Sequence, residues 1–373
     1  MVKWPAACRM KRFLIVTEYP GFQPQAMVRA LQYRPFFEQD QDCNARFVAC
    51  RKYGVERIMH FIDRHTNGWF RPWLFDPVTR LVTSLNERRI VRLARSFDLV
   101  YVIKVRSLSL YRNLSKVAGL RIVKDFGDAL WLPCHQGWGW QGLDEMLRLS
   151  CGVICENGYV EEYARHHNPR TYVVEDTPQV EDFDPWRSKV ARDPSRIVLG
   201  WIGTGANACC LYAIWEVLEK LFIRYPHLHL RIVGAQPGQY PRWEHVRCTN
   251  RVLYDQEVMV REALAMDIGL FPHFDVIDAH ARGNLKAKIY MAGGVAAVCQ
   301  NLGENPKLIQ DGVNGLLASS LDEWHTKLDW LITHKAERER IAQAGLQTVR
   351  TQFSRQASFL RLKTALLELA HAQ

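Results

Sequence analysis

The sequence lacks the long apolar run that a membrane-spanning helix needs. Its 373 residues contain no stretch of about 18 or more uncharged apolar residues, so we expect no transmembrane segment. The basic N-terminus has only a short apolar part, which we predict to begin a strand, and this favours mature protein over a signal peptide. Short-period repeats and low-complexity tracts are also missing. We therefore expect a globular cytoplasmic protein, with peripheral contact at the inner membrane face left open.

The ten cysteines lack the spacing of a metal site. No C-x-x-C pair occurs, and the nearest histidines do not complete a zinc-binding pattern. Cys151 and Cys155 lie in an apolar, strand-like run, and Cys209 and Cys210 begin a predicted helix. We therefore expect buried free thiols in a reducing compartment, with no bound metal and no other cofactor.

Positive charge is concentrated in the first half of the chain. The formal net charge is +10, and residues 46–121 contain sixteen Lys or Arg against five Asp or Glu, a surplus of eleven. Aromatic residues, among them Trp69 and Trp73, are interleaved with the basic ones. The pattern predicts an anionic partner: a lipid phosphate at a membrane face, an acidic glycan or nucleic acid. A solvated basic face above buried aromatics explains it equally well.

Hydrophobic periodicity in the first half alternates between strands and helices. The clearest helical pattern covers residues 82–97, with apolar residues such as Leu85 and Ile90 on one side and four arginines (88, 89, 92 and 95) on the other. We predict strands at 11–18, 45–50, 98–104, 120–125, 152–155 and 171–174, and helices at 26–37, 82–97, 107–118, 143–149 and 160–166. This alternation predicts a Rossmann-like domain over residues 1–175.

A polar, proline-bearing segment, residues 176–195, is the predicted linker to a second domain of the same plan, residues 196–353. We predict its strands at 196–202, 228–233, 251–254, 268–271, 295–299 and 315–318, and helices at 209–222, 258–265, 285–292, 305–310, 321–333 and 336–352.

A glycine-containing loop opens the second domain. The residues Gly203-Thr204-Gly205-Ala206-Asn207-Ala208 follow a predicted strand and precede a predicted helix. Glycines let the backbone approach a diphosphate, and the N–H groups at a helix start bind anions. The letters also fit a dinucleotide fingerprint, but the next strand ends at Val233-Gly234-Ala235 without the carboxylate that would bind the ribose. A dehydrogenase is therefore disfavoured, while a purely structural turn stays open.

Polar side chains from 267 to 320 follow predicted strands. They are His273, Arg282, Asn284, Lys286, Glu304 and Asn305. In parallel sheets wrapped by helices, ligands bind at the carboxyl ends of the strands. A cationic loop that leads into a helix suits an anionic ligand, because positive charge at a helix N-terminus is unfavourable without one.

The same stretch resembles the donor-binding segment of GT-B glycosyltransferases, specifically the large retaining family 4. The residues that match are Gly283-Asn284-Leu285-Lys286, Ile289-Tyr290-Met291-Ala292-Gly293-Gly294, Gly303-Glu304-Asn305-Pro306 and Asp311-Gly312-Val313-Asn314-Gly315-Leu316. The resemblance implies two Rossmann-like domains that face a cleft. It also implies a C-terminal helix, residues 354–373, that crosses back to the first domain.

The resemblance further implies that the second domain binds a nucleotide sugar as substrate. The implied donor-binding residues are Gly203, Thr204, Gly205, Asn207, His273, Asn284, Glu304 and Asn305. Lys286 and, second to it, Arg282 would stabilise the leaving diphosphate, which gains negative charge in the transition state. The sequence departs from the family at Ala281 and Ile289, where members commonly have two glutamates, so the contact to the nucleotide ribose is missing or comes from elsewhere, with Glu304 as a candidate.

In the first domain, residues 124–131 resemble a D-x-D-D-A-x-W segment of some family members. Asp125 or Asp128 would orient an acceptor hydroxyl, with His135 nearby, although a carboxylate that caps the next turn is an equal alternative. Gly21 and Arg29 occupy the N-terminal loop region that meets donor phosphate or acceptor in the family.

The sequence thus predicts metal-independent transfer of a sugar, with retention of configuration, to an anionic acceptor or lipid-linked glycan. The Asp182-Phe183-Asp184 triplet imitates a metal-binding D-x-D motif, but its place in the linker favours coincidence. Three alternatives stay open: a nucleotide-sugar epimerase of the same fold, a DNA-modifying glycosyltransferase that uses the basic region 46–121, and a nucleotide-sugar-binding protein without activity.

Overall fold

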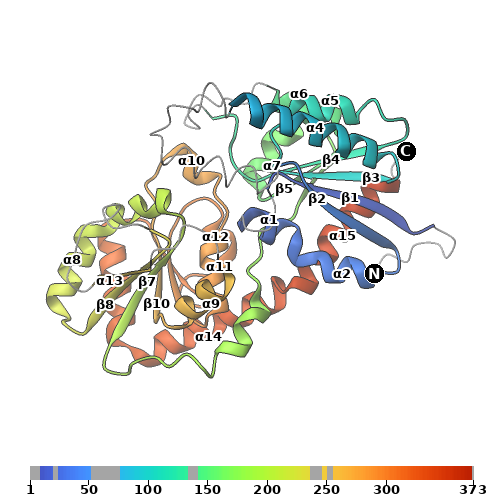
Figure 1. The fold of residues 1–373 in the computed structure, drawn as a ribbon. Helices are drawn as coiled ribbons and strands as arrows, with labels where there is room; N and C mark the ends of the chain where they lie inside the picture. Colours follow the sequence, from blue (N-terminus) through green and yellow to red (C-terminus); the bar gives the residue numbers. More distant parts are fainter. Residues whose placement is uncertain are drawn as a thin grey trace. The chain divides into compact units, whose positions relative to one another are not determined.

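The computed structural model describes residues 9–19, 24–51, 76–132, 142–235, 246–249 and 255–371. The chain divides into two compact units. Unit 1 comprises Met1–Val174 and Phe359–Gln373, and unit 2 comprises Glu175–Ser358. Each unit contains a six-stranded parallel sheet with helices on both faces, so the prediction of two Rossmann-like α/β domains is confirmed (Figure 1). None of the helices within the described residues has the length and apolar content needed to cross a membrane.

The sheet of unit 1 has the strand order β2-β1-β3-β4-β5-β6. Its strands are β1 (Lys11–Thr17), β2 (Cys43–Ala49), β3 (Leu99–Ile103), β4 (Arg121–Phe126), β5 (Gly152–Cys155) and β6 (Thr171–Val173). Its helices are α1 (Pro24–Arg29), the 3-10 helix η1 (Leu31–Tyr33), α2 (Arg34–Gln39), α4 (Asp76–Ala94), α5 (Leu108–Leu114), α6 (Leu143–Leu149), α7 (Gly158–Arg165) and most of α15 (Arg355–His371). All five residues of β3 are buried, as expected for a strand that helices cover on both faces.

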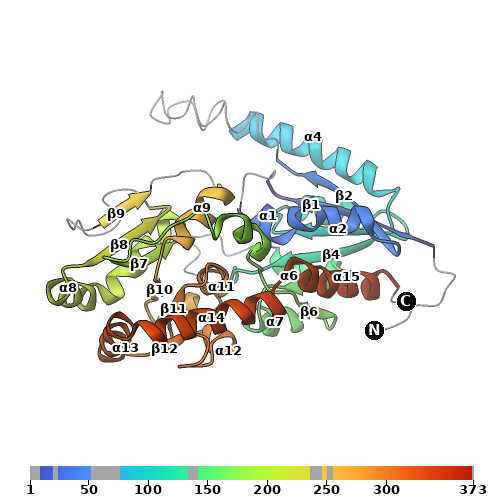
Figure 2. The same ribbon diagram turned by 90° about the horizontal axis from the view of Figure 1, so that it is seen from below.

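Helices α4 and α15 pack on opposite faces of this sheet (Figure 2). Ile90 of α4 belongs to the cluster around Val16 and Val102, whereas Leu366 of α15 belongs to the cluster around Ile15 and Tyr101. The ammonium of Lys363, also on α15, lies 2.6 Å from a carboxylate oxygen of Asp40 and 2.6 Å from one of Asp42. The C-terminal helix therefore crosses back to unit 1, as predicted.

Two predicted helices of unit 1 differ from the structure. The single helix predicted at 26–37 is interrupted, and a new helix starts with Pro35 in its first turn, where a residue without an N–H is tolerated. Helix α4 begins at Asp76, six residues before the predicted start. The prediction that Leu85 lies on the buried side of α4 is wrong, because its side chain is 53% exposed.

The sheet of unit 2 has the strand order β12-β11-β10-β7-β8-β9. Its strands are β7 (Ile197–Ile202), β8 (Leu228–Val233), β9 (Val246–Thr249), β10 (Ile268–Phe271), β11 (Ala296–Gln300) and β12 (Leu316–Ala318). Its helices are α8 (Trp215–Arg224), α9 (Gln256–Leu264), α10 (Ile277–His280), α11 (Leu285–Ala292), α12 (Asn305–Leu308), α13 (Leu321–Thr333), α14 (Lys335–Gln352) and the 3-10 helices η3 (Val180–Trp186) and η4 (Gly205–Ile214).

One face of this sheet packs against α8 and α13, and the other against α9 and α11, with α14 contributing to both clusters (Figure 1). The predicted helix 209–222 is instead η4 followed by α8, so the glycine loop leads into a 3-10 helix and not into an α-helix. The short helix α10 and strand β9 were not predicted. The predicted strand 251–254 lies outside the described residues.

A buried ion pair fixes helix α1 to the sheet of unit 1. Arg29 and Asp125 are 3% and 0% exposed, and the guanidinium donates to both carboxylate oxygens and to the carbonyl of Val174. The hydroxyl of Tyr101 donates to the same carboxylate at 2.5 Å. Removal of one partner would leave an uncompensated buried charge, which costs far more than an exposed pair contributes.

We therefore expect Asp125→Ala to lower the free energy of unfolding by about 3–5 kcal/mol, measured by urea denaturation. The matched control is Asp42→Ala, which removes the exposed partner of Lys363 and should cost about 1 kcal/mol or less. Equal, small losses for the two variants would show that the Arg29–Asp125 pair does not anchor α1.

Candidate functional site

The strand order of unit 2 reverses between β7 and β10. From β7 the chain proceeds through β8 and β9 toward one edge of the sheet, and then through β10, β11 and β12 toward the other. Ligands of open parallel sheets bind where the strand order reverses in this way, at the carboxyl ends of the strands. Gly203 directly follows β7, His273 follows β10 by two residues, and Lys286 lies in the first turn of α11.

The ammonium of Lys286 lies against aromatic rings and the glycine loop. Its Nζ is 4.4 Å from the ring centroid of Trp201 and 5.3 Å from that of Phe271. A Cβ atom added to Gly203 would lie 2.9 Å from this Nζ. Within the described part of the chain, no carboxylate or carbonyl oxygen binds Lys286. Burial, followed by the charge of Arg282, lowers its pKa from 10.5 to about 8, so this cation is partly desolvated.

Tyr290, one turn after Lys286, fixes the position of α11. Its hydroxyl accepts a hydrogen bond from the N–H of Ile202 at 3.1 Å and donates to the carbonyl of Leu270 at 2.9 Å. Ile202 lies on β7 and Leu270 on β10, the two neighbouring strands between which the strand order reverses. Because residues four apart lie on the same side of a helix, the tyrosine that joins both strands also directs Lys286 toward their carboxyl ends.

Close packing leaves no room for a side chain at Gly203, the start of the glycine loop, or at Gly234 beside it. Besides Lys286, a Cβ at Gly203 would meet the ring of Trp201 at 2.6 Å. Gly234, after β8, has φ +90°, and a Cβ there would lie 1.9 Å from the carbonyl oxygen of Gly203. Both positions therefore require glycine, and the loop backbone closes directly around Lys286.

His273 contributes a hydrogen-bonding atom without a partner. Its side chain is buried, Nδ1 lies 3.7 Å from the sulfur of Cys210, and Nε2 has no partner among the described residues. Burial, then the charges of Lys286 and Arg282, lower its pKa to about 3, so the ring is neutral at physiological pH. A buried polar atom without a partner is uncommon and points to a missing ligand. No pattern in the sequence indicated that Cys210 would lie beside this ring.

A chain of hydrogen bonds joins the side chains of Arg282, Asn207 and Thr204. Arg282 donates to Asp278 at 2.7 Å and to the side-chain oxygen of Asn207 at 2.9 Å, and Asn207 donates to the hydroxyl of Thr204 at 3.2 Å. This chain connects the loop before α11 to the glycine loop, which includes Gly205. The catalytic role predicted for Arg282 stays a prediction, for a guanidinium whose charge Asp278 balances.

Three predicted donor-binding residues support the loop after β11. Asn284 donates to the carbonyl of Glu304 at 3.1 Å, Asn305 donates to the carbonyl of Gln300 at 2.9 Å, and Glu304 pairs with Lys307 at 2.8 Å. All three are buried, so their side chains are committed to the protein. The positions where family 4 commonly has glutamates, Ala281 and Ile289, carry buried apolar side chains.

A second polar cluster lies at the corresponding reversal of strand order in unit 1, between β1 and β3. Lys104 directly follows β3, has the left-handed backbone φ of +52°, and lies 3.4 Å from Glu156 and 3.8 Å from Asp128. Asp128, a predicted site residue, is accessible, with 44% of its side chain exposed. Lys104 and Glu156 were missed, and their only sequence signal is that each lies at the end of a predicted strand.

The remaining residues predicted for the first domain and the linker pair with other side chains where the structure describes them. Arg29 and Asp125 are buried against each other, and the acceptor roles predicted for them stay predictions. Gly21 and His135 lie outside the described residues. In the D-x-D triplet, Asp182 pairs with Arg355 and Asp184 with Arg350, so both carboxylates are engaged.

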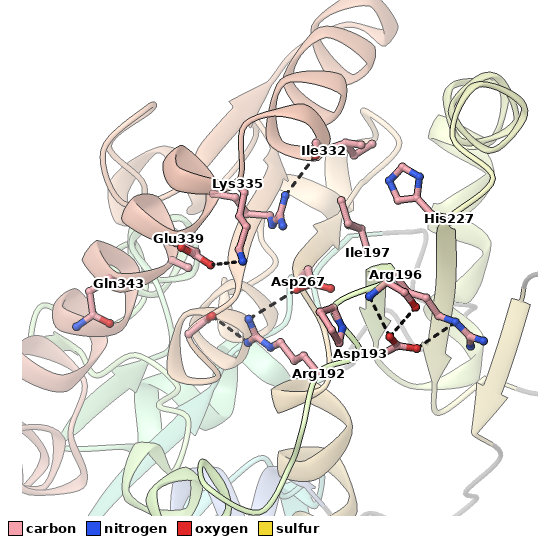
Figure 3. A pocket seen from close by; sticks show the side chains of 15 residues that line it. Arg192, Asp193, Arg196, Ile197, His227, Asp267, Ile332, Lys335, Glu339 and Gln343 are labelled. Atoms are coloured by element: carbon pink, nitrogen blue, oxygen red, sulfur yellow. Dashed lines mark hydrogen bonds and ion pairs between the residues drawn. The ribbon is translucent and has the colours of Figure 1, made fainter.

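A cavity of about 590 Å³ lies at the opposite end of the sheet of unit 2, where strands such as β7 and β10 begin (Figure 3). Its cations have partners: Arg192 donates to the carbonyls of Leu264 and Gly294, Arg196 lies 3.3 Å from Asp193, and Lys335 lies 3.7 Å from Glu339. This cavity differs from the region around Lys286 in two ways. Its cations are paired, and it lies at the amino-terminal ends of the strands, whereas ligands of such sheets bind at the carboxyl ends.

Comparisons with known proteins agree with this fold. Residues 213–362 match the model of a protein family described as glycosyl transferase-like. No curated protein matches the sequence. Among solved structures, the Anabaena protein HepE in complex with UDP-glucose has a TM-score of 0.66 at 13% identity, covering 97% of this chain and 100% of that one.

Two further structures are similar over most of their length. Sucrose-phosphate synthase from Thermosynechococcus elongatus has a TM-score of 0.63 at 12% identity, with 97% of this chain and 100% of that chain covered. UDP-GlcNAc 2-epimerase from Neisseria meningitidis, bound to UDP-GlcNAc, has a TM-score of 0.57 at 12% identity, with 95% and 100% covered. At these identities the likeness concerns the fold alone, and the chain has the GT-B fold of two Rossmann-like domains.

Proposed function

We propose that this chain is a glycosyltransferase that moves a sugar from a nucleotide-diphosphate sugar to an acceptor hydroxyl. The observation that carries the proposal is the ammonium of Lys286, which has no counterion among the described residues and lies beside Gly203 where the strand order reverses. The glycosyl transferase-like match over residues 213–362, which includes Lys286, supports the same function.

The chemistry follows from where negative charge develops. As the bond from the sugar to the diphosphate breaks, the leaving oxygen gains charge, and a cation fixed beside it stabilises the transition state more than the bound donor. Lys286 is prepared for this role because Trp201 and Phe271 hold it without neutralising it. Since a fixed ammonium acts on the diphosphate, we propose transfer without a metal ion.

We further propose that the transfer retains the configuration of the sugar. Among the described residues around Lys286, Asp278 is engaged by Arg282, and Ala281 and Ile289 are apolar. This composition favours departure of the diphosphate and attack of the acceptor on the same face over a covalent sugar intermediate on a carboxylate. His273 Nε2 would bind the donor, and exposed Asp128, with Lys104 and Glu156, would orient the acceptor hydroxyl.

Replacement of the lysine tests the proposal. We expect Lys286→Ala to lower kcat by about 100- to 1000-fold, the usual effect of removing one group that stabilises developing charge. The matched control is Lys335→Ala, which removes a lysine from the first turn of α14 that already pairs with Glu339 and should leave kcat unchanged.

Donors are found by thermal stabilisation with a panel of nucleotide sugars, because a ligand of the folded state raises Tm by mass action. Turnover is then measured with and without candidate acceptors. Sugar isomerisation without any acceptor would replace the proposal with an epimerase. Donor binding without turnover under any acceptor would replace it with a binding protein.

The pH dependence of nucleotide binding provides an independent test. Because the pKa of Lys286 is about 8, its positive charge is present below that pH and is lost above it. The affinity for a nucleoside diphosphate, measured by calorimetry, should therefore fall as the pH rises from about 7 to about 9, a range in which an ordinary lysine stays charged.

The variant Lys286→Gln should bind the same nucleotide weakly and without this pH dependence. A decline of equal size in the wild type and in the variant would assign the titration to another group.

A further inference from the structure

Helix α4 presents a continuous exposed face that combines arginines with apolar side chains. Seven exposed residues form this surface, which we call the α4 face: Val78, Leu81, Leu85, Arg88, Arg89 and Arg92 of the helix, and Arg95 in the turn directly after it. At 3.6 residues per turn they lie within an arc of about 120°. The apolar residues occupy the first half of the face and the arginines the second half.

The opposite side of α4 fixes this orientation. Ile90 and Ala94 are buried in the core of unit 1, and the side-chain amide of Asn86 donates to the carbonyl of Cys50 at 2.6 Å. The single glutamate of the helix, Glu87, is buried on this inner side, where it accepts a hydrogen bond from Ser109 at 2.8 Å. The α4 face therefore contains no acidic residue.

None of the four arginines of the α4 face has an ion-pair partner among the described residues. Arginines on the neighbouring helices differ: Arg112 pairs with Glu145 at 2.6 Å, and Arg165 pairs with Glu161 at 3.0 Å. Unbalanced positive charges spaced along two turns of a helix repel one another, and an external anionic surface would relieve this repulsion.

The apolar residues decide which kind of anionic surface fits. Leu81 and Leu85 are 61% and 53% exposed, and both lie beside the arginines on the same face. On a face that carries both kinds of residue, arginines bind the phosphates of anionic headgroups while neighbouring leucines enter the apolar boundary below them. Nucleic acid would engage the arginines but would gain nothing from the leucines.

We propose that the α4 face docks unit 1 on the surface of an anionic lipid bilayer, with the arginines binding lipid phosphates and the leucines buried in the interface. Figure 2 shows α4 at the outer surface of unit 1, with β2 and β1 on one side of it and α15 on the far face of the sheet. Lipid binding at this face requires no donor or acceptor, so it is tested separately from the proposed sugar transfer.

The test is co-sedimentation of the full chain with vesicles of phosphatidylcholine mixed with phosphatidylglycerol, and with vesicles of phosphatidylcholine alone. We expect binding to the mixed vesicles that weakens as salt is added, and little binding to phosphatidylcholine. Because each cation near an anionic surface contributes about fivefold in affinity, Arg92→Glu should weaken binding by about tenfold or more.

The matched control is Arg80→Glu, which makes the same charge change on the same helix. Arg80 is exposed but lies about 120° from the middle of the α4 face, so this variant should bind within about twofold of the wild type. The double variant Leu81→Ser, Leu85→Ser should also bind weakly while its melting temperature stays that of the wild type or higher.

Two outcomes would overturn the proposal. Equal losses for Arg92→Glu and Arg80→Glu would show that net charge alone drives binding. Binding to a DNA duplex as tight as to mixed vesicles, lost in Arg92→Glu but kept in the double serine variant, would assign the α4 face to nucleic acid.

Discussion

The proposed function of this protein depends on the ammonium of Lys286, which no acidic side chain of the described residues neutralises. A partly desolvated cation without a counterion is unfavourable, and its lowered pKa expresses that cost. The rings of Trp201 and Phe271 compensate only in part, because a cation–π contact leaves the charge in place. A diphosphate would supply the missing negative charge, so the site is complete only with its ligand bound.

The fold produces this site through strand order. Because β7 and β10 are neighbours although β8 and β9 come between them in the chain, the loops after both strands lie at the same end of the sheet, where the strand order reverses. Tyr290 then ties α11 to both strands, and the paired glycines 203 and 234 let the loop backbones close on Lys286. The same reversal between β1 and β3 places Lys104 at the corresponding point of unit 1.

Patterns within short stretches of the sequence predicted the features that are formed by residues close together in the chain. Most strands, the glycine loop and the first-turn position of Lys286 follow from periodicity and from a motif in one contiguous stretch. The partners of Arg29 could not be predicted in this way, since Asp125 and Val174 are 96 and 145 residues away in the chain. The pairing of Arg282 with Asp278 has the i,i+4 spacing of one helical turn, but it depends on α10, a helix too short for its periodicity to be recognised.

The structure also separates side chains that the sequence treats alike. Lys335 pairs with Glu339, whereas Lys286 has no counterion within the part of the chain that the structure describes, although both lie in the first turn of a helix in unit 2. Likewise, Arg92 on the α4 face has no partner among the described residues, whereas Arg112 on the next helix is paired. Lys286 and the arginines of the α4 face thus share one property, positive charge that no acidic residue in the described part of the chain balances.

A crystal structure of the chain with a bound nucleoside diphosphate tests the central claim most directly. The ammonium of Lys286 should then lie within hydrogen-bonding distance of an oxygen of the terminal phosphate, with the diphosphate against the backbone of the glycine loop. A diphosphate bound elsewhere, with Lys286 still contacting only the rings of Trp201 and Phe271, would contradict it.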